Sequence, residues 1–419
     1  MSSSQGTPFL RRRGSDVPTL QLQTMAIHEK PPHIRSHSVR NLSYSNNTVT
    51  WDLANFNDHY ICVKKLGSGA QAAAFILSDI HLPVRQVVAK IYLDTPQNRE
   101  SVNNEIKVLK HLNRSGCKPF LLCFQRNFMC LAKDLASECG SSFSPNSSVL
   151  VVVYDYFFGE GTKDFASLLK ILSLDEEDYE SLSHVERDAY YKISSHIISP
   201  QIQLQIILTL IRSVAYLHDN NVAHMDLKPA NIVVNINTGR IQLIDFGVSC
   251  MESNCLPFGT TLYMAPEVIR SVGKRKPKGI AIVQKLMLGS TSGGEDRKVV
   301  PMASAMLADA WSMGVILFEY IHGQMPHDFP MDALFYHLGQ AKQEHIFQTN
   351  FDHPNADVAR AVGTVIDGFL QVDPNLRLSV VEAKDILQPL IDISLSPAPH
   401  SPMSPSPLSP RASPLSPFE

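Results

Sequence analysis

The sequence predicts an α+β fold in which a β-rich part precedes a mainly helical part. Strand-type patterns of β-branched and aromatic residues occupy residues 60–66, 73–77 and 86–92. Farther along, residues 201–220 carry apolar side chains three and four positions apart, which is the spacing of a buried helix. A second apolar run begins at Asp309 and predicts another buried helix. Strands that come first, with long helices after them, are typical of the α+β class.

The remaining elements follow from the same kinds of pattern. A glycine-rich turn at Gly67-Ser68-Gly69 follows the first strand, and such a turn lets backbone amides approach phosphate oxygens. Residues 98–112 have the apolar spacing of a helix, and residues 149–154 are a continuous β-branched run that predicts a buried strand. Shorter elements are predicted at residues 165–172 (helix), 232–234 and 241–244 (strands).

Composition divides the chain into three regions. Residues 1–55 are rich in Ser, Asn, Arg and Pro and predict a disordered arm, whereas residues 56–392 predict one folded domain. Residues 393–419 predict a disordered tail, which contains seven Ser-Pro pairs. This tail is either a plain spacer or a substrate of a proline-directed kinase.

Composition also limits the expected partners. The formal net charge of −3 gives no reason to expect a nucleic-acid partner. No uninterrupted apolar run approaches the roughly 20 residues of a membrane span, so no membrane is expected either. Seven cysteines, without a Cys-x-x-Cys pair, predict reduced thiols in an intracellular protein, cytoplasmic or nuclear. The alternative is a zinc site, for which the candidate ligands are Cys117, Cys123, Cys130 and Cys139.

The densest group of chemically useful residues is the stretch His-Met-Asp-Leu-Lys-Pro-Ala-Asn at residues 224–231. Asp226 can accept a hydroxyl proton, Lys228 can stabilise a phosphate and Asn231 can ligate a metal, which are the parts that phosphoryl transfer needs. Farther on come Asp245-Phe246-Gly247 and then Ala265-Pro266-Glu267.

That ordered set resembles the catalytic core of the eukaryotic-type protein kinases. Upstream, Lys90 in Val88-Ala89-Lys90 stands where the family keeps its phosphate-binding lysine, and Glu105 lies fifteen residues after it on the predicted helix. The resemblance covers about residues 60–390. It implies a two-lobed kinase fold with an N-lobe at 56–153, a hinge at 154–158 and a C-lobe at 159–392.

The resemblance also implies the roles of individual residues. Asp226, Lys228 and Thr260 would be catalytic, and Asn231 and Asp245 would hold Mg²⁺. A lysine two positions after the aspartate, with Thr260 placed to bond both, resembles the serine/threonine class, so the expected partner is a protein substrate with Ser or Thr. The implied ATP-binding residues are Leu66, Gly67, Ser68, Gly69, Ala74, Ala89, Lys90, Glu105, Asp155 and Phe157.

The resemblance implies scaffold roles for two residues and a pocket-lining role for a third. Asp309 would hold the backbone of the catalytic loop, and Arg377 would form an ion pair with Glu267. Tyr154 occupies the position that controls the depth behind the adenine pocket, and a tyrosine there predicts a shallow pocket.

The chain departs from the family pattern in its length. Insertions are expected at about residues 113–148, 173–198 and 270–305. The third contains four basic residues, which form either a docking surface for an acidic partner or part of a plain surface loop: Lys274, Arg275, Lys276 and Lys278.

Three substitutions mark it as a divergent, non-RD member. The third glycine of the family loop is Ala72, and the usual aromatic at the loop tip is Gln71. Met225 replaces the arginine that normally pairs with a phosphorylated residue of the activation segment, so activity should depend little on such phosphorylation. The competing interpretation is a catalytically weak pseudokinase that acts as a binding or scaffold module.

Overall fold

The computed structural model describes residues 49–68, 72–140, 142–156, 162–172, 199–272, 299–326 and 349–395. All of them belong to the compact unit Asn47–Glu419, one of two units into which the chain divides. Several predictions lie outside the described residues: those on Gly69, Gln71, Phe157, the basic residues at 274–278, the insertion at 173–198 and the seven Ser-Pro pairs.

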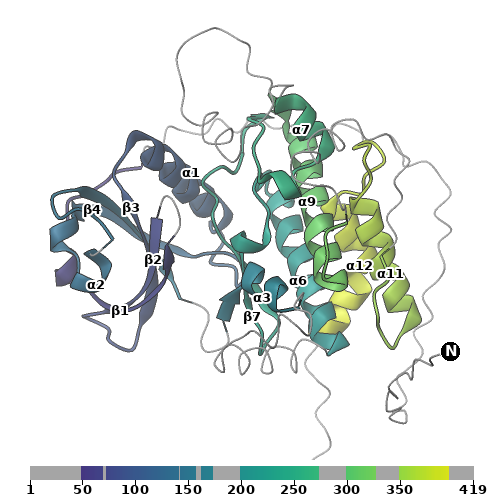
Figure 1. Ribbon diagram of the computed structural model, residues 1–419, viewed down its shortest axis with the longest axis horizontal. Coiled ribbons are helices and arrows are strands. Elements are labelled where there is room, and N and C mark those ends of the chain that lie inside the picture. Colours follow the sequence, from purple (N-terminus) through teal and green to yellow (C-terminus); the bar gives the residue numbers. More distant parts are fainter. Residues whose placement is uncertain are drawn as a thin grey trace, which may run out of the picture. The chain divides into compact units, whose positions relative to one another are not determined.

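The N-terminal part is a five-stranded antiparallel sheet with one long helix beside it (Figure 1). Its strand order is β1-β2-β3-β5-β4, with bounds Tyr60–Ser68 (β1), Ala72–Asp79 (β2), Gln86–Leu93 (β3), Phe124–Leu131 (β4) and Ser148–Asp155 (β5). Helix α1 (Pro96–Leu112) begins where a threonine side chain at position 95 accepts a hydrogen bond from a backbone amide of the first turn. It packs on the sheet face that carries Tyr92, Val152 and Tyr154.

The sequence analysis missed strand β4 and placed the end of the disordered arm too late. Strand β4 lies inside the supposed insertion at 113–148 and pairs with β5. Residues 49–55, predicted to be disordered, run along β4, since Asp52 O accepts a hydrogen bond from Met129 N at 2.8 Å and Ala54 N donates to Met129 O at 3.0 Å. Trp51 Nε1 donates to Asn103 Oδ1 on α1 at 2.9 Å. This segment escaped prediction because it is held largely by backbone hydrogen bonds, which leave no hydrophobic period in the sequence.

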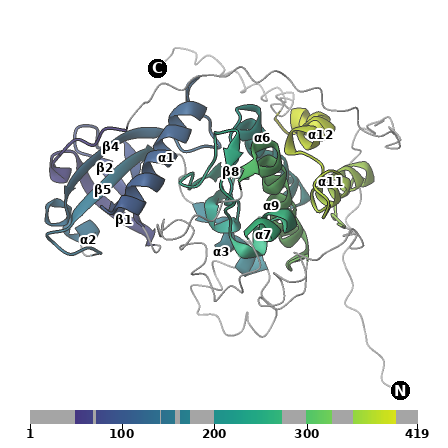
Figure 2. The ribbon, with the colours of Figure 1, turned by 90° about the horizontal axis from the view of Figure 1, so that it is seen from above.

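The C-terminal part is built on long helices. These are α6 (Pro200–Asp219), α9 (Met302–His322), α11 (Ala356–Phe369) and α12 (Val380–Leu395), with the shorter α3 (Phe165–Leu172) and α7 (Pro266–Val272). Helix α12 packs on α6, and α11 packs on α9 (Figure 2). Two small sheets complete this part: β6 (Thr162–Asp164), β7 (Ile232–Asn235) and β8 (Arg240–Leu243), and the pair β9 (Asn254–Cys255) and β10 (Val300–Pro301).

Two boundaries of this part differ from the prediction. Helix α9 begins at Met302 instead of Asp309, because the preceding alanine- and methionine-rich residues continue the helix. Asp309 therefore lies in the middle of a buried helix with only 1% of its surface exposed. Helix α12 extends to Leu395, three residues into the predicted tail.

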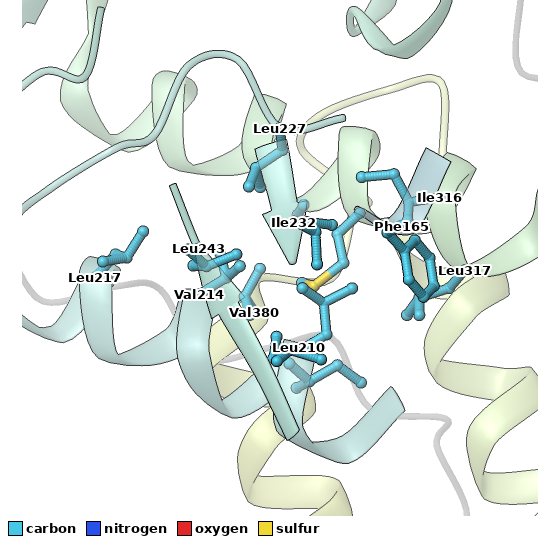
Figure 3. Close-up of a cluster of buried hydrophobic side chains, with 14 of the residues drawn as sticks. Phe165, Leu210, Val214, Leu217, Leu227, Ile232, Leu243, Ile316, Leu317 and Val380 are labelled. Atoms are coloured by element: carbon cyan, nitrogen blue, oxygen red, sulfur yellow. The ribbon is translucent and has the colours of Figure 1, made fainter. Parts of the chain in front are cut away.

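The core of the C-terminal part encloses the residues on both sides of the segment 228–231. Leu227 and Ile232 are buried on either side of the Lys-Pro-Ala-Asn sequence. They belong to a cluster drawn from α3, α6, β7, β8, α9 and α12, labelled in Figure 3 as Phe165, Leu210, Val214, Leu217, Leu227, Ile232, Leu243, Ile316, Leu317 and Val380. Because protein cores are close-packed, this anchoring fixes the path of the loop between the two residues.

Helix α9 is apolar and long enough to cross a membrane by length and hydropathy, alone among the helices of the described ranges. In its most apolar window 56% of the residues are buried inside the protein. The helix packs on α3, α6, α11 and α12, so its apolar surface is that of a core helix.

The prediction of reduced cysteines was wrong for four of them. Cys117 is joined to Cys123 and Cys250 to Cys255, with Cα atoms 5.5 and 5.7 Å apart. Both pairs close loops of only a few residues, which brings the sulfurs together locally.

Replacing Trp51 by alanine should test whether the segment before residue 56 belongs to the fold. Loss of its ring packing and of its hydrogen bond to Asn103 should lower stability by about 2 kcal/mol, which lowers Tm by roughly 3 °C in a domain of this size. Leu53→Ala is the matched control, because the Leu53 side chain is 83% exposed and its loss should change Tm little. Equal Tm values for the two variants would contradict this boundary.

Candidate active site

The carboxylate of Asp226 is the centre of the site. It is 7% exposed, and its two oxygens accept hydrogen bonds from different partners. Thr260 Oγ1 donates to Oδ1 at 2.7 Å, and Lys228 Nζ donates to Oδ2 at 2.7 Å. Lys228 Nζ also donates to Thr260 Oγ1 at 3.0 Å. The structure therefore brings together the three residues that the sequence suggested as catalytic.

Asn231 fixes the same loop from the other side. It ends the short 3₁₀ turn Pro229–Asn231, and its Nδ2 donates to Asp226 O at 2.8 Å and to Asp226 Oδ2 at 3.2 Å. Because the amide nitrogen is engaged in this way, the amide oxygen is the atom of Asn231 that suits a metal.

Asp309 holds the backbone immediately before Asp226. Its Oδ2 accepts a hydrogen bond from His224 N at 2.7 Å, and its Oδ1 accepts one from Met225 N at 2.9 Å. His218 Nε2 lies 3.1 Å from the same Oδ2. Met225 has a φ of 69°, a left-handed conformation that costs a residue with a side chain roughly 1–2 kcal/mol. The hydrogen bonds from Asp309 hold the loop in this conformation.

Lys90, which is partly buried, and Glu105, which is buried, form an ion pair across the face of the sheet, with Nζ 3.0 Å from Oε1. Burial alone would lower the pKa of Lys90. The charges of Glu105 and Asp245 and the hydrogen bond to Glu105 outweigh this effect and raise its pKa, so the ammonium stays charged at neutral pH. A fixed cation facing the site suits a phosphate.

The residues implied to bind ATP on the sheet lie side by side. Gly67 on β1 pairs with Ala74 on β2, and Ala74 pairs with Lys90 on β3. Ser68 and Leu66 continue β1, and Ala89 is fully buried. A Cβ added at Gly67 would meet no protein atom within 4 Å, so protein packing does not require a glycine there. Open space beside a glycine is what the approach of a ligand needs.

At the predicted hinge, the structure describes Asp155 but not Phe157. The Asp155 amide donates to Cys123 O at 2.9 Å. Its carboxylate is engaged by Arg85 at 2.7 Å and by Gln125 at 2.6 Å. The amide and the carboxylate of Asp155 are thus both engaged within the protein.

Asp245 is exposed and has a φ of 67°. Its negative charge helps to raise the pKa of Lys90. Together with Asn231 it offers hard oxygen donors, which are the ligands that Mg²⁺ prefers. The donor set therefore fits the metal that the family uses.

Asn104, next to Glu105 on α1, is a site residue that the sequence analysis did not single out. Its Nδ2 donates to the backbone oxygens of Phe246, Gly247 and Ser249 at 3.3, 3.2 and 2.8 Å. A Cβ at Gly247 would collide with the hydroxyl group of the serine at position 101, also on α1. The helix thus lies directly against the start of the activation segment, and an amide beside the paired glutamate was the only hint in the sequence.

The end of the activation segment is anchored to the helical part. Arg377 makes two hydrogen bonds to the Glu267 carboxylate at 2.6 and 2.9 Å, and Ser312 Oγ donates to Tyr263 O at 2.7 Å. Tyr263 also donates its hydroxyl to Glu319 at 3.0 Å. Burial raises the pKa of Glu319, and the hydrogen bond from Tyr263 lowers it in part.

Met225 lies in an apolar cluster instead of a charged pocket. The buried members of this cluster are Ala223, Met225, Cys255, Val300 and Ala305. The middle of the activation segment is held against it by backbone hydrogen bonds, since the residues at positions 223 and 250 exchange two such bonds and β9 pairs with β10.

The comparisons with known proteins agree with this geometry. The family model described as protein kinase domain matches residues 60–281, and the chain belongs to the protein kinase family. Membership confirms the predicted α+β, two-lobed kinase fold.

The chain is similar to several kinases, two of which are named serine/threonine-protein kinases. "Probable serine/threonine-protein kinase fhkA" of Dictyostelium discoideum is 25% identical over 378 residues, which cover 83% of this chain and 53% of that protein. The phosphorylase b kinase gamma catalytic chain, liver/testis isoform, of Rattus norvegicus is 31% identical over 185 residues, which cover 42% and 38%. Serine/threonine-protein kinase cds1 of Schizosaccharomyces pombe is 24% identical over 345 residues, which cover 78% and 57%. The matches thus span between 38% and 57% of the length of these relatives.

Replacing Asn104 by alanine should loosen the start of the activation segment. Loss of its hydrogen bonds to three backbone oxygens should make the amides of residues 246–250 exchange about tenfold faster in native-state hydrogen exchange. Asn103→Ala is the matched control, because Asn103 lies on the same helix but bonds Trp51. Equal exchange at residues 246–250 in the two variants would contradict the role given to Asn104.

Proposed function

We propose that this protein is an active serine/threonine kinase, which transfers the γ-phosphoryl group of ATP to Ser or Thr hydroxyls of protein substrates. The observation that carries the proposal is the arrangement around Asp226, whose carboxylate accepts hydrogen bonds from Lys228 and Thr260 at 2.7 Å each. A buried, oriented acid can position a substrate hydroxyl and accept its proton, and the lysine beside it can stabilise the phosphate that the hydroxyl attacks.

In the proposed reaction, the substrate hydroxyl oxygen forms a bond to the γ-phosphorus while the bond to the β–γ bridging oxygen breaks and ADP leaves. Asp226 orients the hydroxyl and accepts its proton. Lys228 lies beside the transferring group and offsets its negative charge. Thr260 bonds both residues and so fixes their relative position.

Nucleotide and metal have separate places in this proposal. Lys90, held by Glu105, binds the phosphates that are not transferred, and the backbone oxygen of Asp155 faces the adenine edge. Asn231 and Asp245 would hold Mg²⁺, and its positive charge would offset the negative charge of the phosphates.

Three observations support Ser and Thr of proteins as the acceptor. Lys228 follows Asp226 by two positions and shares Thr260 with it, which is the arrangement of serine/threonine kinases. Relatives that match much of the chain are named serine/threonine kinases. The anchored segment from Thr260 to Glu267 supplies a firm surface on which a protein could dock.

Labelled ATP tests the proposal directly. With γ-labelled ATP and generic protein substrates, Asp226→Asn should reduce phosphate transfer by about 100-fold or more, because it removes the proton acceptor. Asp219→Asn is the matched control, since Asp219 is engaged by Lys384 at 2.9 Å, outside the site, and its loss should change the rate less than about twofold. Wild-type transfer no greater than that of Asp226→Asn would favour a scaffold protein with the kinase fold.

We also propose that activity does not require phosphorylation of the activation segment. Met225 stands where a basic residue would bind a phosphate, and its surroundings are apolar. Ser249 is 6% exposed and donates its hydroxyl to His224 O, so it is not accessible to another kinase. Backbone pairing of β9 with β10 already holds the middle of the segment.

Phosphatase treatment should therefore leave kcat/KM within about twofold of the untreated value, and so should Ser253→Ala and Thr261→Ala. Thr260→Ala is expected to lose activity for a different reason, since it removes the bonds to Asp226 and Lys228. A tenfold or larger loss after phosphatase treatment would contradict the proposal.

A further inference from the structure

The carboxylate of Glu105 has more hydrogen-bond donors than its ion pair with Lys90 provides. Tyr154 Oη donates to Oε1 at 2.9 Å, the same oxygen that lies 3.0 Å from Lys90 Nζ. Tyr92 Oη donates to Oε2 at 3.3 Å. All of this is buried, since Glu105 is 1%, Tyr154 0% and Tyr92 6% exposed.

The sheet places these hydroxyls beside the lysine. Tyr92 follows Lys90 by two positions on β3, so the two side chains leave the same face. Tyr154 on β5 pairs with Val88, two positions before Lys90. Helix α1 covers that face and brings Glu105 over it.

A buried carboxylate with a single partner is unstable unless its remaining lone pairs are satisfied. Burial and the neighbouring charge of Glu105 raise the pKa of both Tyr92 and Tyr154 well above the usual value, so both hydroxyls are protonated donors at neutral pH. Because a phenol is neutral, it satisfies the carboxylate without cancelling its charge, and Glu105 keeps its attraction for Lys90.

The consequence concerns the ammonium group. The ammonium group of a lysine has three N–H donors on a flexible side chain, without the fixed planar geometry of a guanidinium group. Its donors therefore orient toward the acceptors that are least satisfied by other groups. With two hydroxyls on the carboxylate, Glu105 is satisfied while using one N–H of Lys90. The other donors of the ammonium then remain for the phosphates of a nucleotide.

We propose that Tyr92 and Tyr154 are positioning residues, which hold the Glu105 carboxylate so that Lys90 presents its remaining N–H groups to ATP. This rests on the proposed function, since it assigns the second partner of Lys90 to a nucleotide. The two tyrosines also hold α1 against the sheet through Glu105, which is next to Asn104, the residue that binds the activation segment.

Removing the hydroxyls with their rings retained tests the proposal. Tyr92→Phe and Tyr154→Phe should each lower kcat/KM for Mg·ATP about tenfold, mainly through KM, because Lys90 would bind the non-transferred phosphates equally before and during reaction. Direct binding of Mg·ATP should weaken by a similar factor, and KM for the protein substrate should stay unchanged. Tyr320→Phe is the matched control: Tyr320 is 3% exposed, and its hydroxyl has no hydrogen-bond partner in the described part of the chain. It should leave all three constants unchanged.

Coupling to Glu105 separates positioning from packing. In a Glu105→Ala background, or Glu105→Gln if the alanine variant does not fold, adding Tyr154→Phe should change Mg·ATP affinity by less than about twofold. A loss as large as in the wild-type background would overturn the proposal, and so would Tyr→Phe variants that bind Mg·ATP like the wild type.

The binding measurement also distinguishes this proposal from the proposed function. If the wild type transfers no more phosphate than Asp226→Asn but its Mg·ATP affinity still depends on the two hydroxyls, the enzyme activity is refuted and the positioning role stands. If the wild type binds no Mg·ATP, the positioning role is refuted as well.

Discussion

The hydrogen bonds from Asp309 to the backbone of His224 and Met225 are the constraint on which the site depends. A carboxylate in the middle of a buried helix is costly unless its oxygens accept hydrogen bonds, and here His218 and two backbone amides lie within bonding distance of the Asp309 oxygens. The left-handed conformation of Met225 follows from this attachment, and it turns the chain so that Asp226 meets Lys228 and Thr260. Helix α9 therefore positions Asp226 through Asp309, and the contacts of Asp226 with Lys228 and Asn231 come from its own loop.

Helix α1 joins the two parts of the catalytic centre. Glu105 faces Lys90 and the sheet, whereas the adjacent Asn104 binds the backbone at the start of the activation segment. One helix thus bears on both Lys90, the cation proposed to bind the nucleotide, and the segment that follows Asp245, a proposed metal ligand. A rotation of α1 would disturb the contact with Lys90 and the contact with the activation segment together. The tyrosines that hold Glu105 therefore help to fix both contacts.

The sequence predicted the local parts of this site well and the non-local parts poorly. Asp226, Lys228 and Asn231 lie within six positions, so their proximity follows from the chain itself. The Lys90–Glu105 pair was predictable because the resemblance supplied its spacing. Strand β4 and the segment around Trp51 were missed because backbone hydrogen bonds to other segments hold them in place. Such bonds leave no periodic pattern of apolar residues in the sequence. The hydroxyls of Tyr92 and Tyr154 meet Glu105 only once the register of β3 and β5 is known.

The pairing of β9 with β10 has a consequence for the long stretch that precedes α9. That stretch leaves the described structure after α7 and rejoins it at β10, where Val300 pairs with Cys255. The described residues on both sides of it are therefore fixed. In general, the free-energy cost of closing a flexible connection between two fixed ends rises only with the logarithm of its length, by about 0.6 kcal/mol for each doubling. Residues can be added or removed there at little thermodynamic cost to the domain. This is a position at which a kinase domain can accept new sequence over evolutionary time while the core helix and the catalytic loop it holds remain unchanged.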